Sequence, residues 1–166
     1  MSKELMVQIV NDFGQEIGTQ LDVDDEAYCC LAVGEEFQIH LKFNEHFDGM
    51  ILYAELGEVP SIGKKEILRH YVMQNGSIDS DNLAFSFDDE SKQLGMACLL
   101  PKTFMNLDNF KKLLEKLITR HEKEHEDMGR FLQGDLPKDD IKFAENNGAG
   151  GETIPAGGMD AQFMHL

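Results

Sequence analysis

The side chains best placed for chemistry lie in the segment His121-Glu122-Lys123-Glu124-His125. Two histidines four residues apart on a helix share one face and can chelate zinc. The glutamate after the first can activate a water, as in the H-E-x-x-H pattern of zinc peptidases. A catalytic zinc needs a third protein ligand, and the chain beyond this helix is a Gly-rich tail. The charged surroundings favour a solvated helix face, with adventitious zinc or nickel binding and a small zinc-dependent hydrolase as alternatives.

The remaining motifs are incomplete. The Gly-rich segment 147–151 lacks the Gly-Lys-Ser/Thr that a phosphate-binding loop requires. The acidic run 22–26 begins like a calcium-binding loop, but Ala27 stands where the turn Gly belongs and Val33 where the bidentate Glu belongs. Cys98 lies in an apolar segment, which predicts an inert buried thiol. We therefore predict no catalytic residue, no metal site and no cofactor, and we expect a protein that is not an enzyme.

Charge and cysteine content narrow the class of protein. The 166 residues include 31 acidic and 15 basic ones, a formal net charge of -16. Such a surface repels nucleic-acid phosphate and anionic lipid, so neither is an expected partner. Three cysteines without CxxC spacing indicate a reducing cytoplasm, and the adjacent Cys29 and Cys30 point to opposite faces of a strand. The first residues lack the pattern of a signal peptide and no apolar run has membrane-spanning length, so we expect neither a signal peptide nor a membrane span.

The elements that would position any site follow from hydrophobic periodicity. Residues 36–43 alternate apolar and polar side chains without a break, which predicts a strand with one buried and one wet face. Further strands are predicted at 27–33, 50–56, 83–88 and 93–100. Apolar residues at three- and four-residue steps predict helices at about 2–17, 64–75 and 107–132. The order α-β-β-β-α-β-β-α predicts an α+β fold with a mostly antiparallel twisted sheet packed on helices.

The chain divides at about residue 133. Residues 1–133 carry the periodic elements and form the predicted α+β domain. Residues 134–166 are acidic and Gly-rich with little periodicity, so they cannot bury enough apolar surface to offset their conformational entropy. We expect this tail to be disordered.

The first helix and the strands at 27–56 carry more apolar residues than one helix-on-sheet layer needs. Core packing accounts for most of them. The excess is also suited to grooves for an extended peptide, with an exposed sheet edge available for strand addition. The Leu68 and Val72 side of the short helix, with Phe85 and Phe87, fits either the core or a subunit interface.

Taken in order, these elements resemble the class I type III secretion chaperones, the Tir-chaperone-like family. The resemblance is carried by the alternating second strand, by the segment Leu56-Gly57-Glu58-Val59-Pro60 that ends the third, and by the following helix, hairpin and long helix. It covers about residues 3–132. Two features depart from the family: Trp is absent, whereas the last helix of the family often carries one, and the Gly-rich tail lies outside the common core.

The resemblance implies a homodimeric bacterial cytoplasmic protein with a role in virulence and protein transport. Such a chaperone binds the N-terminal segment of secreted effectors, keeps it partly extended and soluble, and presents it to the secretion apparatus, whose components are further candidate partners. The expected effector-binding residues are Leu5, Ile9, Phe13, Phe37, Ile39, Leu41, Leu52 and Ala54. The expected dimer-interface residues are Leu68, Tyr71, Val72, Phe85 and Phe87.

Overall fold

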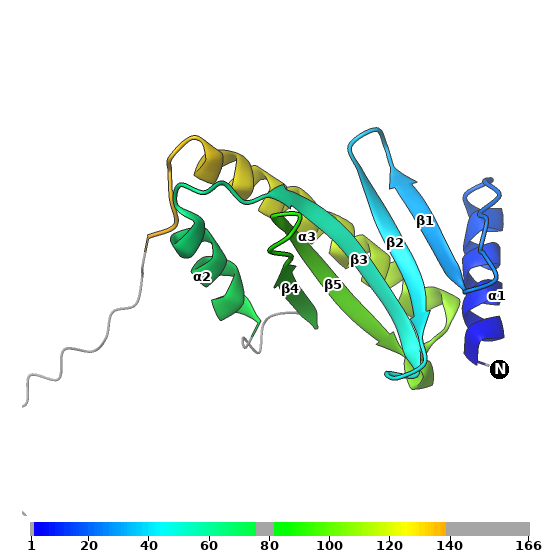
Figure 1. The fold of residues 1–166 in the computed structure, drawn as a ribbon. Helices are drawn as coiled ribbons and strands as arrows, with labels where there is room; N and C mark the ends of the chain where they lie inside the picture. The colour runs from blue at the N-terminus through cyan, green and yellow to red at the C-terminus, as the bar shows by residue number, and fades with distance from the viewer. Residues whose placement is uncertain (1, 76–81, 139–166) are drawn as a thin grey trace, which may run out of the picture.

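A five-stranded antiparallel sheet forms the centre of the fold in the computed structural model, which describes residues 2–75 and 82–138 (Figure 1). The strand order is β1-β2-β3-β5-β4, so β1 and β4 are the two edges. The predicted α+β class and the predicted element order are both confirmed. The elements are α1 (Ser2–Glu16), β1 (Tyr28–Val33), β2 (Phe37–Asn44), β3 (Gly49–Glu58), α2 (Lys64–Gln74), β4 (Leu83–Phe87), β5 (Gln93–Pro101), a 3-10 turn (Lys102–Phe104) and α3 (Leu107–Leu132).

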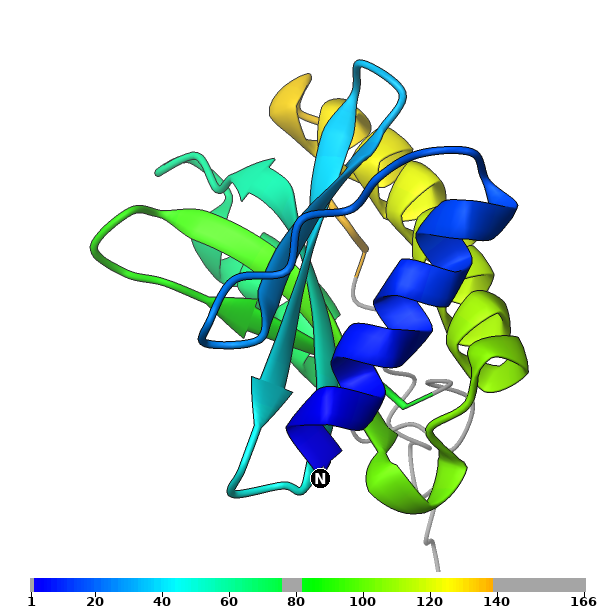
Figure 2. The ribbon, with the colours of Figure 1, turned by 90° about the vertical axis from the view of Figure 1, so that its right-hand side faces the viewer.

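Helices cover one face of the sheet. Figure 2 shows α1 and α3 on the same side, with the other face of the strands uncovered. The alternation in β2 explains this arrangement, because Ile39 and Leu41 are fully buried beneath the helices whereas Gln38 and Lys42 are exposed. α1 packs on α3 through an edge-to-face contact between Phe13 and Phe110, whose ring centroids are 5.3 Å apart. α2 lies beside β4, at the far end of the sheet from α1 (Figure 1).

α3 begins after Asn106, whose side chain accepts a hydrogen bond of 2.9 Å from the Asn109 N–H and so satisfies a free donor of the first turn. Its buried positions recur in steps of four and three residues, the spacing of a stripe along one side of a helix. Two of these positions hold polar residues. The buried residues are Phe110, Leu114, Leu117, His121, Glu124, Met128 and Phe131.

The sheet opens at one end between β2 and β3. Their pairing ends at Ile39 opposite Ala54, next to a bulge between Glu55 and Gly57 in the pairing of β3 with β5. Gly57 lies within the bulge with φ of 134°, a conformation that L side chains rarely adopt. The two strands therefore diverge, and a hollow remains between the start of β2 and the end of β3.

The domain boundary expected at 133 is followed by a short segment that contacts the fold. Leu136 packs against the core, and the Arg130 side chain bonds the Asp135 carboxylate at 2.9 Å. Residues 139–166, the bulk of the predicted tail, lie outside the described residues, so the division into domain and tail stays a prediction. Within the described residues, no helix combines the length and apolarity that crossing a membrane requires.

Candidate functional site

The outer edge of β1 has no neighbouring strand among residues 2–75 and 82–138. In an antiparallel pair, alternate residues direct their backbone groups to the neighbouring strand. The Ala27 carbonyl accepts a bond of 3.1 Å from the Phe43 N–H, which fixes this alternation. Tyr28, Cys30 and Ala32 therefore face outwards. The Tyr28 N–H and C=O are both bonded by Asp24, whereas Cys30 and Ala32 are exposed and offer four backbone groups at the edge.

The outer edge of β4, on the opposite side of the sheet, is closed at Phe85. Asn75, the residue after α2, bonds both outward groups of Phe85: its Nδ2 donates to the Phe85 carbonyl at 2.9 Å, and its Oδ1 accepts from the Phe85 N–H at 2.6 Å. One carboxamide thus occupies the positions that a neighbouring strand would use. An edge with unpaired backbone groups is a template for pairing with another chain, so the two edges of this sheet are unequal.

The predicted effector-binding residues separate into two groups. Leu5, Phe13 and Phe37 are half-buried and keep surface that a partner can contact. The other five are at most 3% exposed and form the core, where a partner cannot reach them, so the prediction is corrected for these side chains. Alternation in a sequence identifies an apolar face but not whether helices of the same chain cover it. The five core residues are Ile9, Ile39, Leu41, Leu52 and Ala54.

The predicted dimer-interface residues also divide. Tyr71 is 1% exposed and donates a hydrogen bond of 3.4 Å to the Glu124 carbonyl, and Phe85 is 7% exposed, so both belong to the core rather than to a surface. Val72 is 64% exposed, and Leu68 and Phe87 are half-buried. The outer side of α2 thus keeps an apolar surface, to which the exposed Met73 adds.

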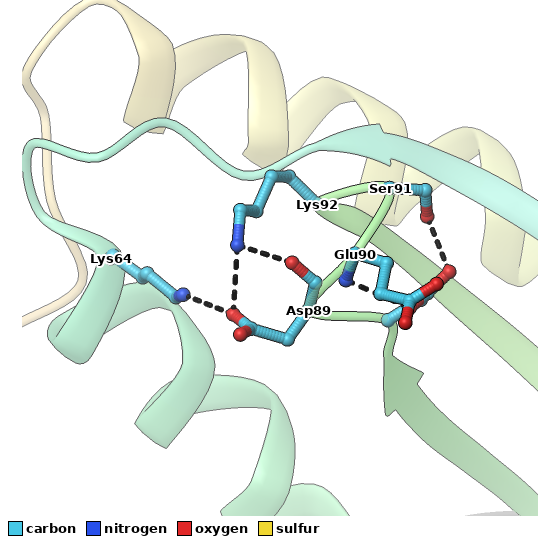
Figure 3. Close-up of polar contacts among 6 residues, drawn as sticks. Lys64, Asp89, Glu90, Ser91 and Lys92 are labelled. Atoms are coloured by element: carbon cyan, nitrogen blue, oxygen red, sulfur yellow. Dashed lines mark hydrogen bonds and ion pairs between the residues drawn. The ribbon is translucent and has the colours of Figure 1, made fainter.

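The start of α2 is held by the turn between β4 and β5 (Figure 3). Lys64 and Lys92 both contact the Asp89 carboxylate, at 2.9 and 3.1 Å, and their hydrogen bonds and charges lower the pKa of Asp89. The Lys64 ammonium also lies 4.7 Å from the centre of the Phe87 ring. Exposed ion pairs contribute little to stability individually, but these contacts position the helix against the hairpin.

The H-E-x-x-H segment does not form the solvated face that its charges predicted. His121 is 3% exposed, its Nε2 lies 2.7 Å from the Glu55 carbonyl oxygen, and its ring stacks on Phe37 with centroids 3.7 Å apart. A carbonyl only accepts, so Nε2 carries the hydrogen. Burial lowers the pKa of His121, and the nearby His125 lowers it further. Glu122 and His125 are exposed.

The structure offers no support for the zinc alternative. Across residues 2–75 and 82–138, no three His, Cys, Asp or Glu side chains are grouped so that they could hold a metal ion. The stacked rings of His121 and His125 have centroids 5.9 Å apart. His121 contributes to packing instead: it bonds the backbone of β3 where β2 and β3 diverge.

The second polar residue of the α3 stripe, Glu124, is 1% exposed. Its Oε1 lies 2.6 Å from Nε of Arg120 in an ion pair whose angles fall short of a hydrogen bond. The Arg120 guanidinium also contacts Oε1 of Gln74 in α2 and lies 5.9 Å from the centre of the Phe85 ring. This ion pair, in which only Glu124 is fully buried, connects α3 to α2 and β4. Sequence reasoning missed it, although the three- and four-residue spacing of the stripe continues through both His121 and Glu124.

The cysteines lie where the strand pattern predicted. Cys29 is buried and Cys30 is exposed, on opposite faces of β1, and neither forms a disulfide. Cys98 is buried in β5, where burial raises the pKa of its thiol to about 12. Burial also raises the thiol pKa of Cys29, so neither buried cysteine is an activated nucleophile, which requires a lowered thiol pKa.

Comparisons with known proteins agree with this architecture. One similar solved structure is the ExsC–ExsE complex, with 18% identity and a TM-score of 0.66, over 76% of this chain and 94% of that chain. A second is the HopA1–SchA chaperone–effector complex, with 16% identity and a TM-score of 0.64, over 76% of this chain and 97% of that chain. A third is the heterodimeric ExoU–SpcU complex from the type III secretion system of Pseudomonas aeruginosa, with 19% identity and a TM-score of 0.57, over 70% of this chain and 94% of that chain. At these identities the likeness shows the fold. A comparison with curated protein sequences found no match.

The sequence model of one family matches residues 8–123, which is well over half of the chain and runs from α1 into α3. That span includes the outer edge of β1, the contacts of Asn75 with Phe85 and most of the helix-covered core. The chain therefore belongs to the Tir chaperone protein (CesT) family, the class I type III secretion chaperones that its element order resembles.

Proposed function

We propose that this member of the family, a type III secretion chaperone, binds the N-terminal segment of secreted effectors, keeps that segment partly extended and soluble, and presents it to the secretion apparatus. The likeness to solved complexes whose names pair a chaperone with an effector supports an effector as the partner. We also propose that the protein is located in the bacterial cytoplasm. Binding of this kind requires no reaction, in keeping with a family of chaperones.

The observation that carries the proposal is the inequality of the two sheet edges. An extended client pairs with a strand through its backbone, whatever its sequence, and its side chains then supply selectivity. Cys30 and Ala32 offer such a strand two N–H and two C=O groups, whereas Asn75 occupies the matching groups of Phe85 on β4. We infer that the client strand adds to β1.

Backbone pairing at β1 needs apolar anchors as well. Four hydrogen bonds at about 0.5–1.5 kcal/mol each contribute roughly 2–6 kcal/mol, and ordering a disordered segment costs about 2–5 kcal/mol or more. These terms nearly cancel, so net affinity depends on apolar side chains of the client. Leu5, Phe13 and Phe37, half-buried on α1 and β2, are the residues of the expected set that remain available for this contact.

The test replaces Ala32 with proline and, as the matched control, with valine. Proline removes the outward N–H and is tolerated in an edge strand, whereas valine keeps the N–H and favours strand formation. We expect Ala32→Pro to weaken binding of effector N-terminal segments at least about tenfold, since it removes one bond and misplaces its neighbours. Ala32→Val should bind like the wild type. Calorimetry with segments encoded near this gene provides the measurement; equal affinity of both variants would exclude pairing at β1.

We further propose a homodimer formed through the outer side of α2. Val72 and Met73 are more than half exposed and Leu68 is half-buried, and contiguous apolar surface of this kind marks protein interfaces. The contacts of Lys64 with Asp89 hold the helix in place for such an interface. A Val72→Glu variant should shift the mass measured by light scattering at micromolar concentration from two chains to one. A wild-type monomer in that assay would contradict the proposal.

A further inference from the structure

The hollow between the diverging ends of β2 and β3, which we call the splay cavity, has a volume of about 290 Å³. This lies at the small end of the range of roughly 300–1,000 Å³ for ligand pockets, so it suits one side chain better than a whole ligand. α3 closes one side of it through His121 and His125. Its lining residues are Glu36, Phe37, Gln38, His40, Glu55, Leu56, Gly57, Gln93, His121 and His125.

The charged groups of the splay cavity are all negative. Glu36 and Glu55 line it and are exposed, and none of the lining residues is Lys or Arg. With a net charge of -16 on the chain, the surrounding field also attracts cations. Gln38 and Gln93 add side-chain carbonyls that accept hydrogen bonds. The cavity is thus rich in acceptors for a donor-bearing cation.

His121 adds one more acceptor to the lining of the cavity. This side chain is 97% buried and lines the cavity, and its Nε2–H is used by the Glu55 carbonyl. The neutral ring then presents Nδ1 as an acceptor. Nδ1 is not one of the fully enclosed atoms without a partner in the described residues, so it can accept a hydrogen bond from a donor that enters the cavity.

We propose that the splay cavity binds an arginine side chain of the client segment. The inference rests on the proposed function and names a feature of the client. A guanidinium carries five N–H donors in one plane, which match acceptors spread around a cavity, and its flat face stacks on aromatic rings. The stacked pair of Phe37 and His121, 3.7 Å between centroids, supplies such a surface. A lysine ammonium offers three donors from one point and cannot stack in this way.

The experiment uses the full chain, labelled with nitrogen-15, and blocked tripeptides Ac-Ala-Xaa-Ala-NH2 in which Xaa is arginine, lysine or norleucine. We expect the arginine peptide to cause saturable shifts of the backbone amides of Gln38, Gly57 and Gln93 in two-dimensional NMR spectra. The lysine peptide should bind at least about threefold more weakly, because it makes fewer hydrogen bonds. The norleucine peptide should cause no saturable shift.

Two charge variants complete the test. The double variant Glu36→Gln with Glu55→Gln should lower the affinity for the arginine peptide at least about fivefold, since it removes both charges of the cavity. Asp108→Asn with Glu115→Gln removes two exposed charges of α3 outside the cavity lining and should leave affinity unchanged. Shifts located elsewhere, equal binding of arginine and lysine peptides, or equal binding by the two double variants would overturn the proposal. No effector is needed, so this outcome is independent of pairing at β1.

Discussion

The ion pair between Arg120, whose side chain is 27% exposed, and the buried Glu124 yields a prediction of large effect. The Glu124 carboxylate is 1% exposed, its charge is balanced by Arg120 Nε at 2.6 Å, and its Oε2 has no hydrogen-bond partner among the described residues. Replacing Arg120 with methionine keeps much of the apolar stem but leaves the carboxylate without its counter-charge. Removing one partner of a buried pair costs about 3–5 kcal/mol. We expect Arg120→Met to lower the free energy of unfolding by that amount.

The double variant Arg120→Met with Glu124→Leu separates the cost of the unpaired charge from the cost of lost packing. Taking both charges out of water is costly, so an apolar pair of similar volume is often neutral or stabilising. We expect the double variant to lie within about 1 kcal/mol of the wild type. Lys111→Met serves as the control for an exposed pair, because Lys111 contacts Glu16 at 2.8 Å in solvent, and it should cost at most about 1 kcal/mol.

Urea unfolding followed by circular dichroism gives these free energies, with the protein concentration held constant because a dimer would make them concentration-dependent. The m-values should match between variants, so that differences in midpoint report stability. A cost of Arg120→Met no larger than that of the surface control would refute the reasoning. A double variant as unstable as the single one would do the same, because the loss would then come from packing rather than from an unpaired charge.

Three further outcomes are expected. Asn75→Ala should cost about 1–3 kcal/mol in urea unfolding, because both outward backbone groups of Phe85 lose their partner, and Asn75→Asp should lose only the donated bond. A thiol reagent at pH 8 should react at Cys30 alone in the native protein and at all three cysteines in urea; rapid native reaction of two would contradict the burial. Burial lowers the pKa of His121 in the folded state, so below about pH 6.5 the unfolded state binds a proton that the folded state does not. The free energy of unfolding should therefore fall as the pH decreases from about 6.5 towards the native pKa, at up to about 1.4 kcal/mol per pH unit. His121→Gln should flatten that dependence, whereas His46→Gln should not.

Much of the fold could be predicted from the sequence. The strand at Phe37–Asn44 was evident from its alternation, and α3 runs between the residues that its apolar stripe indicated. Both patterns are local, because a strand repeats every two residues and a helix every 3.6, and each element shows its own period. The order of the elements then indicated the family that the sequence model identifies.

The candidate site was harder to predict because it depends on which faces are covered. Ile39 and Leu52 have the composition of a binding groove, yet the helices of the same chain bury them. The charges of the H-E-x-x-H segment suggested a wet surface, whereas His121 lies in the buried stripe of α3. The three- and four-residue spacing of buried positions in α3 continues through the polar residues His121 and Glu124. Spacing along a helix predicts burial of a position even where its residue is polar.

The sequence by itself determined the strands, the helices, their order and the acidic charge, because these follow from short-range periodicity and composition. Only the tertiary structure decided which sheet edge is open. The pairing of β4 with β5 directs the groups of Phe85 outwards, and Asn75, ten residues earlier, closes them. It also decided that His121 bonds the Glu55 carbonyl at the divergence of β2 and β3. The first contact joins residues ten apart and the second joins residues 66 apart in the chain, and no local pattern of residues specifies either.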